Sequence, residues 1–158
     1  MTDIGALKPA SLKYHHHRFN FRPPRALNGD KKAMFNHVMV GVNDLEASRK
    51  FYDALLGALG YGPGVANRNR FFYRNPSGTF AITTPLNGEA ACHGNGSTLG
   101  FTAQSTAQVD AFHAAGTANG GTTCEDPPGF RDGAAGKLYI AYLRDPDGNK
   151  LCAIHRSA

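Results

Sequence analysis

Few side chains in this sequence could do chemistry, and they are widely scattered. His37 lies near the start of the apolar run 35–42, and Arg131 lies in the rigid turn Asp126–Asp132. Tyr142 and Cys152 belong to two apolar segments near the C-terminus. A neutral imidazole and a thiolate can bind a transition metal, and a guanidinium can bind a carboxylate or phosphate. The three cysteines are irregularly spaced without a CxxC pair, so we expect reduced thiols rather than a zinc ribbon or a disulfide framework.

Each of these side chains also has a structural interpretation. A cysteine in an apolar strand packs as a small hydrophobic residue, and reactivity would require a cationic neighbour that lowers its pKa. Arg131 could form an ion pair with an aspartate of its own turn, and His37 could simply be hydrogen-bonded to its neighbours. Tyr139 and Tyr142 have opposite strand parity, so at most one faces a cleft, and we take Tyr142 as the candidate.

The composition fits one folded domain. The chain has 158 residues and is 41% hydrophobic and 18% charged, which excludes a fully disordered protein. No apolar run is long enough to span a bilayer, and the N-terminus has no apolar signal-peptide core. We therefore expect a cytoplasmic protein with no membrane partner.

The positive charge is concentrated in the first 33 residues. They hold seven basic and two acidic residues, a net charge of +5, which leaves ten of each sign in the rest of the chain. We interpret residues 1–33 as a disordered basic extension and residues 34–158 as the folded domain. His15–His17 could contact RNA or chelate a metal, and Arg68–Tyr73 mixes basic and aromatic residues as nucleic-acid binders do. We favour a flexible tail and a β-strand for these segments, and expect no nucleic-acid partner.

An internal repeat organises the folded domain. The apolar run 35–42 predicts a strand, and Asp44 can cap a helix that ends near Gly57 or Gly60. The same pattern returns in the strand 98–103 and in a helix that begins after Ser105. Moving 61 positions forward carries His37 to Thr98 and Asp44 to Ser105. The chain therefore contains two copies of one unit.

Both copies end in similar hairpins. Strands are predicted over 70–74 and 79–84 in the first copy and over 137–144 and 150–155 in the second, with the turns Asn75–Gly78 and Asp145–Gly148 between them. Each copy is thus one strand, one helix and two or three further strands. Two such modules, about 34–85 and 96–156, predict an α+β domain in which a curved mixed sheet surrounds a cleft and the helices lie outside.

These elements resemble the vicinal oxygen chelate superfamily, which includes glyoxalase I, extradiol dioxygenases, fosfomycin-resistance proteins and bleomycin-binding proteins. The resemblance spans Met34 to Arg156 and rests on the strand Phe35–Val38, the stretch Gly94–Gly96 and the ending Arg144–Leu151. It implies two βαβββ modules and, commonly, a divalent metal that holds two substrate oxygens in the cleft.

The resemblance also implies where metal ligands would lie. His37 occupies the first-strand histidine position, Thr98 is its counterpart in the second module, and Cys152 stands where family enzymes place a glutamate. The fourth position falls on Ala81 or Ile82, neither of which coordinates a metal. A site for zinc, iron, nickel or manganese is therefore possible but incomplete.

Three functions remain open at this point. The leading one is a glyoxalase-like or bleomycin-resistance-like protein that binds a small polar or aromatic ligand in its cleft with a degenerate metal site. The second is a metal-dependent lyase, isomerase or dioxygenase that uses His37 and Cys152, with Arg131 and Tyr142 as further candidate catalytic residues. The third is a metal-free protein that sequesters an antibiotic. The resemblance implies a homodimer in each case.

Overall fold

The computed structural model describes residues 35–133 and 136–156, so the predictions made for residues 1–33 lie outside the described residues. The first module consists of β1 (His37–Gly41), α1 (Leu45–Gly57), β2 (Val65–Ala66), β3 (Arg70–Asn75) and β4 (Gly78–Thr83). The second consists of β5 (Leu99–Thr102), α2 (Thr106–Ala118), β6 (Thr122–Thr123), β7 (Gly129–Gly133), β8 (Gly136–Arg144) and β9 (Lys150–Arg156).

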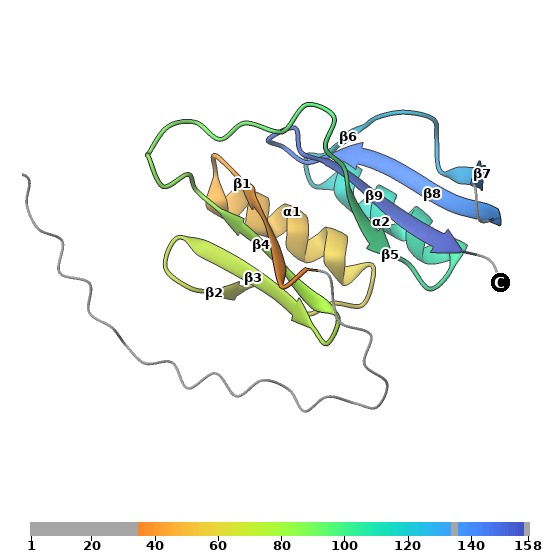
Figure 1. The fold of residues 1–158 in the computed structure, drawn as a ribbon, viewed down its shortest axis with the longest axis horizontal. Coiled ribbons are helices and arrows are strands. Elements are labelled where there is room, and N and C mark those ends of the chain that lie inside the picture. Colours follow the sequence, from red (N-terminus) through yellow and green to blue (C-terminus); the bar gives the residue numbers. More distant parts are fainter. Residues whose placement is uncertain (1–34, 134–135, 157–158) are drawn as a thin grey trace, which may run out of the picture. The chain divides into compact units, whose positions relative to one another are not determined.

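Each module forms its own mixed sheet. In the first, β1 runs parallel to β4 and the strand order is β1-β4-β3-β2. In the second, β5 runs parallel to β9, the order is β5-β9-β8-β6, and β7 also pairs with β8. The two helices contact each other and cover one side of the sheets (Figure 1). The predicted α+β fold with external helices is confirmed.

Both helices begin at the residues that the sequence predicts. The Asp44 carboxylate accepts a hydrogen bond from the Ala47 amide at 2.9 Å, and the Ser105 hydroxyl accepts one from the Gln108 amide at 3.2 Å. Side-chain oxygens at this position satisfy amides that have no partner in the first helical turn. Both helices have 13 residues, and in the described part of the chain no helix is long and apolar enough to cross a membrane.

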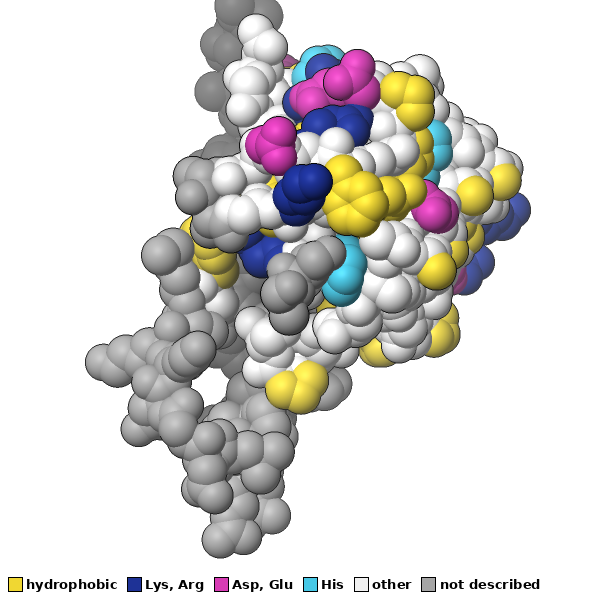
Figure 2. Space-filling model, turned by 90° about the vertical axis from the view of Figure 1, so that its right-hand side faces the viewer, with side chains coloured by type: hydrophobic (Ala, Val, Ile, Leu, Met, Phe, Trp, Pro, Cys, Tyr) yellow, Lys and Arg dark blue, Asp and Glu magenta, His cyan; other side chains and the backbone are white. Residues whose placement is uncertain are grey.

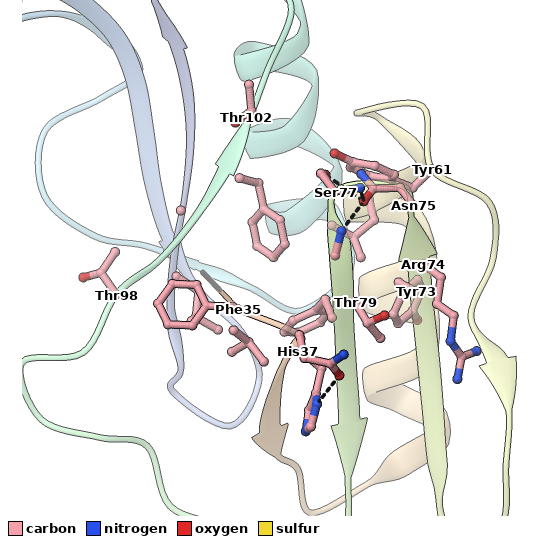
Figure 3. A pocket seen from close by; sticks show the side chains of 18 residues that line it. Phe35, His37, Tyr61, Tyr73, Arg74, Asn75, Ser77, Thr79, Thr98 and Thr102 are labelled. Atoms are coloured by element: carbon pink, nitrogen blue, oxygen red, sulfur yellow. Dashed lines mark hydrogen bonds between the residues drawn. The ribbon is translucent and has the colours of Figure 1, made fainter. Parts of the chain in front are cut away.

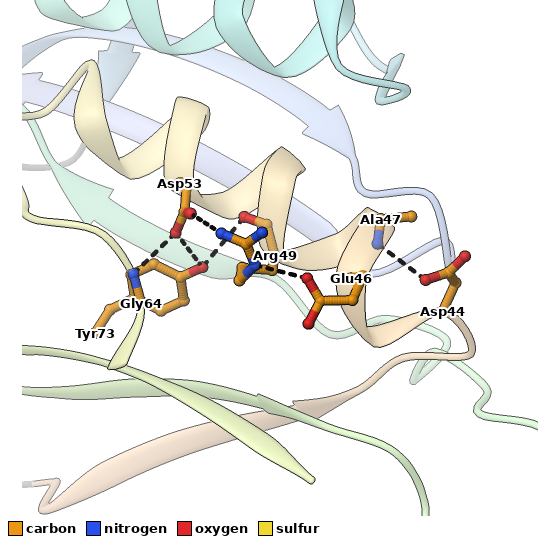
Figure 4. Close-up of polar contacts among 7 residues, drawn as sticks. All are labelled: Asp44, Glu46, Ala47, Arg49, Asp53, Gly64 and Tyr73. Atoms are coloured by element: carbon orange, nitrogen blue, oxygen red, sulfur yellow. Dashed lines mark hydrogen bonds and ion pairs between the residues drawn. The ribbon is translucent and has the colours of Figure 1, made fainter. Parts of the chain in front are cut away.

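The Asp53 carboxylate of α1 binds three donors, one of which, Tyr73, lies on β3 (Figure 4). The carboxylate accepts hydrogen bonds from the Tyr73 hydroxyl and the Gly64 amide, each at 2.9 Å, and forms an ion pair with Arg49 at 3.1 Å. Burial, and then the hydrogen bond to Asp53, raise the pKa of Tyr73, so its phenol remains a donor. Tyr73 is therefore held on the helix side of its sheet.

Alternation along the strands gives each sheet two different faces. Phe80 and Ile82 of β4 belong to the hydrophobic core under the helices. Ala81 between them is fully buried, and Cys152 of β9 is 3% exposed, yet neither belongs to this core. Since successive strand residues point to opposite faces, Ala81 and Cys152 lie on the face turned away from the helices.

The core is continuous across the two modules. Phe80 of β4 packs against Tyr52 of α1 at a centroid distance of 4.9 Å and against Phe101 of β5 at 5.5 Å. Phe101 in turn lies 6.0 Å from Phe112 of α2. Burial of these rings from both modules in one cluster means that neither module has a complete core without the other.

A buried carboxylate joins the second module to α1. Asp145, 3% exposed, begins the turn between β8 and β9 and accepts a hydrogen bond from the Tyr52 hydroxyl at 2.6 Å. Within the turn, it also accepts from the Asn149 amide and side chain, both at 2.8 Å, and from the Asp147 amide at 3.0 Å. Burial, followed by the charge of Asp145, raises the pKa of Tyr52 well above its usual range, so the phenol stays protonated and donates.

Two further residues of this turn also bind the first module. The Asp147 carboxylate accepts from the backbone and side chain of Asn43, at 2.9 and 2.7 Å, and from the Ser48 hydroxyl at 3.2 Å. The Asn149 side chain donates to the Gly41 carbonyl at 3.3 Å. Because the partners lie on β1, on α1 and between them, we call residues 145–149 the joint turn.

The equivalent turn of the first module makes only local bonds. The Asn75 side-chain oxygen accepts from the Ser77 amide and hydroxyl, at 2.9 and 2.8 Å, and from the Gly78 amide at 3.0 Å. The two turns thus share the predicted Pro and Gly positions. Asp147, whose side chain binds the first module in the joint turn, is replaced here by Ser77. The repeat is asymmetric at this point.

Three strands were not predicted from the sequence. β2 and β6 have two residues each and carry no detectable pattern. The prediction of a rigid turn over Asp126–Asp132 is wrong from Gly129 onward, because Gly129 and Arg131 pair with Ile140 and Leu138 of β8. Backbone pairing to a long neighbouring strand decides the structure of this segment, and its glycine-rich sequence does not show that.

We expect Tyr52→Phe to lower the free energy of unfolding by about 1–3 kcal/mol, because it leaves the buried Asp145 carboxylate without its donor from α1. Tyr142→Phe is the control, since within the described residues the Tyr142 side chain contacts Lys150 through its ring and its hydroxyl makes no hydrogen bond. Urea unfolding of both variants measures the difference. Equal stabilities for the two variants would contradict the role of the joint turn.

Candidate functional site

A cavity of about 560 Å³ lies between the modules, where β1 and the β3–β4 hairpin face β5. Figure 3 shows Thr98 and Thr102 on one side of it and Tyr61 and Asn75 on the other. Its existence follows from the topology, because β1 and β5 are edge strands of separate sheets and no backbone ladder closes the space between them. The volume suits one small organic molecule.

Aromatic rings form much of the wall. Tyr73, Phe80 and Phe101 line the cavity with parts of the same rings that build the core, and Phe35 stands at the rim with 65% of its surface exposed. The ring centroids of Tyr73 and Phe80 are 6.0 Å apart. Such a wall favours contact with a flat apolar group.

Several polar groups at the cavity are already bonded to protein atoms. The His37 Nδ1 atom lies 3.0 Å from the Asn36 side-chain oxygen. The Asn75 oxygen is occupied within its own turn, and the Tyr73 hydroxyl donates to Asp53. These groups therefore shape the cavity more than they offer free hydrogen bonds.

A row of three residues runs along one wall. Thr79 of β4 is paired with Arg74 of β3 and with His37 of β1, so the three lie side by side across neighbouring strands. All three line the cavity, and no aspartate or glutamate is among its described lining residues. The wall is thus positive or neutral.

The candidate metal positions are only partly brought together. His37 and Thr98 line the same cavity, as the repeat predicts. Cys152 does not line the cavity. It lies on β9 beside Gly100 of β5, so close that a Cβ added to Gly100 would be 3.4 Å from the Cys152 sulfur. The pairing of Gly100 with Cys152 and of Met39 with Ala81 places Ala81, rather than Ile82, at the fourth position.

The residues present do not fit the family's metal site. Ala81 has no donor atom and Thr98 is a poor ligand when neutral, which leaves one imidazole and one thiol. Within residues 35–133 and 136–156, no three His, Cys, Asp or Glu side chains lie close enough together to hold a metal ion. We therefore assign no chemical step to a metal.

Cys152 and Tyr142 are neighbours on the second sheet. They are paired across β8 and β9, and both lie on the face opposite the helices. Burial raises the pKa of Cys152 to about 11, more than the nearby Lys150 lowers it. Burial, and then the nearby Cys152 and Glu125, also raise the pKa of Tyr142. Both groups are neutral at pH 7 and supply neither a thiolate nor a base.

Lys150 closes this cluster without offering a free charge. Its ammonium group forms an ion pair with Glu125 and lies 4.8 Å from the centroid of the Tyr142 ring. The hydrogen bond to Glu125 raises the pKa of Lys150. The cation is therefore already neutralised by a partner in the loop between β6 and β7.

Arg131 is likewise engaged by its own loop. Its guanidinium donates to the carbonyls of Pro127 and Phe130, at 2.7 and 3.0 Å, and lies 3.9 Å from the Asp126 carboxylate. The structural interpretation as an ion pair with Asp126 is thus the arrangement observed. Figure 2 faces the end of the module that carries β7 and shows basic and acidic side chains together beside exposed hydrophobic ones, with no large surface of a single sign.

The basic and aromatic run in β3 is a strand, as favoured from the sequence. Phe71 and Tyr73 face the core and are at most 9% exposed, so they cannot stack on bases. Arg74 instead lies over the Phe72 ring at 4.4 Å on the opposite face. The sequence did not predict that Arg74 and Thr79 line the cavity, because their alignment with His37 depends on the register between β1 and β4.

Comparison with known proteins agrees with this fold. The family model of the Glyoxalase/Bleomycin resistance protein/Dioxygenase superfamily matches residues 34–153. A solved glyoxalase/bleomycin resistance protein from Albidiferax ferrireducens T118 is 80% identical, with a TM-score of 0.77, and the match covers 78% of this chain and 99% of that one. No curated protein matches the chain.

More distant structures show the same fold. A glyoxalase-related enzyme from Fulvimarina pelagi is 22% identical with a TM-score of 0.60, and the match covers 78% of this chain and 88% of that one. A glyoxalase/bleomycin resistance protein/dioxygenase family enzyme from Burkholderia phytofirmans PsJN is 16% identical with a TM-score of 0.58, covering 76% and 96%. At these identities the likeness concerns the fold alone.

The raised pKa of Cys152 predicts a specific pH dependence of stability. The unfolded thiol ionises near pH 8.5, whereas the folded thiol ionises at about 11, so this stabilisation is complete below pH 8.5 and is lost as the pH rises toward 11. The stability advantage of the wild type over Cys152→Ala should therefore shrink by about 2 kcal/mol between pH 8 and 10.5. Chemical denaturation across this range measures it.

Cys92 provides the control because it is exposed. Cys92→Ala should follow the wild-type pH dependence throughout. If the curves of the wild type and Cys152→Ala stay parallel up to pH 10.5, Cys152 is not the buried neutral thiol described above.

Proposed function

Because the chain belongs to the glyoxalase/bleomycin resistance protein/dioxygenase superfamily, we propose that it binds a small organic ligand in the cavity between its modules, without a metal ion. The observation that carries the proposal is the cavity itself, about 560 Å³ with an aromatic wall and a few polar groups at its rim. Sites for small molecules have this mixture of apolar surface and sparse polar groups.

The donor set supports binding without a metal. Two of the four positions that correspond to family ligands are Ala81 and Thr98, and the thiol of Cys152 is held neutral. A metal ligand must be deprotonated if it is a thiol, so binding a metal at Cys152 would have to overcome the burial that raises its pKa.

The same residues argue for binding rather than turnover. General acid–base catalysis needs a group whose pKa lies near the working pH. The pKa values of Tyr142 and Cys152 are both raised away from neutrality, and the Arg131 guanidinium is bonded within its loop. None of these three residues lines the cavity, whose aromatic wall and few polar groups suit the holding of a ligand, as in a protein that sequesters a small molecule.

Fluorescence titration of the full-length protein with N-phenyl-1-naphthylamine, a neutral aromatic probe, tests the proposal. We expect saturable binding at one site per chain, with the same affinity in EDTA and in added zinc, nickel or manganese. Thr98→Trp should weaken binding by about tenfold or more, because Thr98 is exposed at the cavity wall and an indole at this position would fill part of the cavity.

Thr122→Trp is the matched control, since Thr122 is also exposed but does not line the cavity. Its affinity should equal that of the wild type. Binding that needs a metal would support the metal-dependent alternative instead, and binding that ignores Thr98→Trp would place the ligand elsewhere; either result contradicts the proposal.

A further inference from the structure

We infer that the ligand of this cavity is an aromatic oxyanion, whose carboxylate, sulfonate or phosphate is bound by Arg74 and Thr79 while its ring enters the aromatic part of the cavity. This inference rests on the proposed function and adds the chemical class of the ligand. The argument comes from strand register, from the partners of the other cations and from the charges around the cavity.

Strand register places three polar groups in one row. Arg74 is paired with Thr79 across β3 and β4, and Thr79 with His37 across β4 and β1. Directly opposed side chains in a sheet have Cβ atoms roughly 4.5–5.5 Å apart. An oxyanion placed over the Thr79 hydroxyl is therefore within reach of the Arg74 guanidinium on one side and has the imidazole of His37 on the other.

Among the described lining residues of the cavity, Arg74 is the one lysine or arginine, and it lacks a polar partner. The buried Nε atom of Arg70 on the same strand also lacks one, but Arg70 does not line the cavity. Among the described residues the Arg74 guanidinium makes no hydrogen bond or ion pair, and it rests over the Phe72 ring at 4.4 Å. Arg131 is bonded to its loop and Lys150 to Glu125. Arg144, which occupies the position equivalent to Arg74 in the second module, donates to the Gly148 carbonyl at 2.7 Å.

In the second module, the cations at the equivalent strand positions are bonded to acceptors of the protein itself. There, Arg144 is paired with Lys150, and each has an acceptor within the module. In the first module the equivalent pair is Arg74 and Thr79, and the described residues supply Arg74 with no acceptor. An external anion can take that place.

The location of Arg74 suits a ligand that enters ring first. Figure 3 shows its guanidinium at the outer edge of the cavity, and the side chain is exposed, so it can turn toward an anion without breaking an ion pair. A guanidinium binds oxyanions in a bidentate manner and remains charged at every physiological pH. No carboxylate among the described lining residues would repel the ligand.

A pair of probes that share one ring system tests the charge preference. 8-Anilinonaphthalene-1-sulfonate is the sulfonated counterpart of N-phenyl-1-naphthylamine, so the ratio of their affinities isolates the anion. In full-length protein we expect the sulfonate to bind about tenfold more tightly. Arg74→Gln should remove most of this preference by weakening the sulfonate alone. Arg70→Gln is the control, because Arg70 precedes it on β3 and does not line the cavity.

The outcomes separate this inference from the proposed function. If both probes bind at the Thr98→Trp-sensitive site with equal affinity, or if Arg74→Gln retains the preference, the anion inference is wrong while the cavity remains a binding site. If neither probe binds at a site that Thr98→Trp blocks, the proposed function fails and the inference fails with it. Retention of the preference in Arg70→Gln and its loss in Arg74→Gln would support the inference.

Discussion

The structure depends on how one buried carboxylate is satisfied. Asp145 is almost inaccessible to water, and a charge in such a place is destabilising unless donors surround it. Two residues of its own turn and Tyr52 of α1 supply those donors. Since Tyr52 also packs in the shared aromatic core, the hydrogen bond fixes the second module on the first and sets the position of the edge strands.

The two copies of the hairpin differ where the cavity lies between the edge strands β1 and β5. The joint turn reaches across to Asn43 and Ser48 through Asp147, whereas the corresponding turn of the first module bonds only to itself and lines the cavity. One copy of the hairpin thus holds the modules together and the other leaves space between them. The same asymmetry appears in the polar rows, because Arg144 is bonded internally and Arg74 is not.

Much of the fold could be predicted because its signals are local. Asp44 and Ser105 start helices through contacts within one turn, and the alternating strands around Ala81 and Cys152 follow from periodicity. The site was harder to predict, since the alignment of Arg74 with His37 across Thr79 depends on the register of β4 with β1, which is a long-range pairing. The protonation of Cys152 likewise depends on burial, which an apolar strand suggests but does not quantify. Periodicity also missed β7, whose pairing with β8 is a matter of backbone geometry.

The central claim is that the joint turn fixes one end of the module interface while the equivalent turn at the cavity remains only locally bonded. Amide hydrogen exchange in the native full-length protein tests it directly. The amides of Asn43 and Asn149, which donate to Asp147 and Asp145, should exchange only on global unfolding, and those of Ser77 and Gly78 should exchange through local opening at least about a hundredfold faster. Equal exchange rates in the two turns would contradict the account.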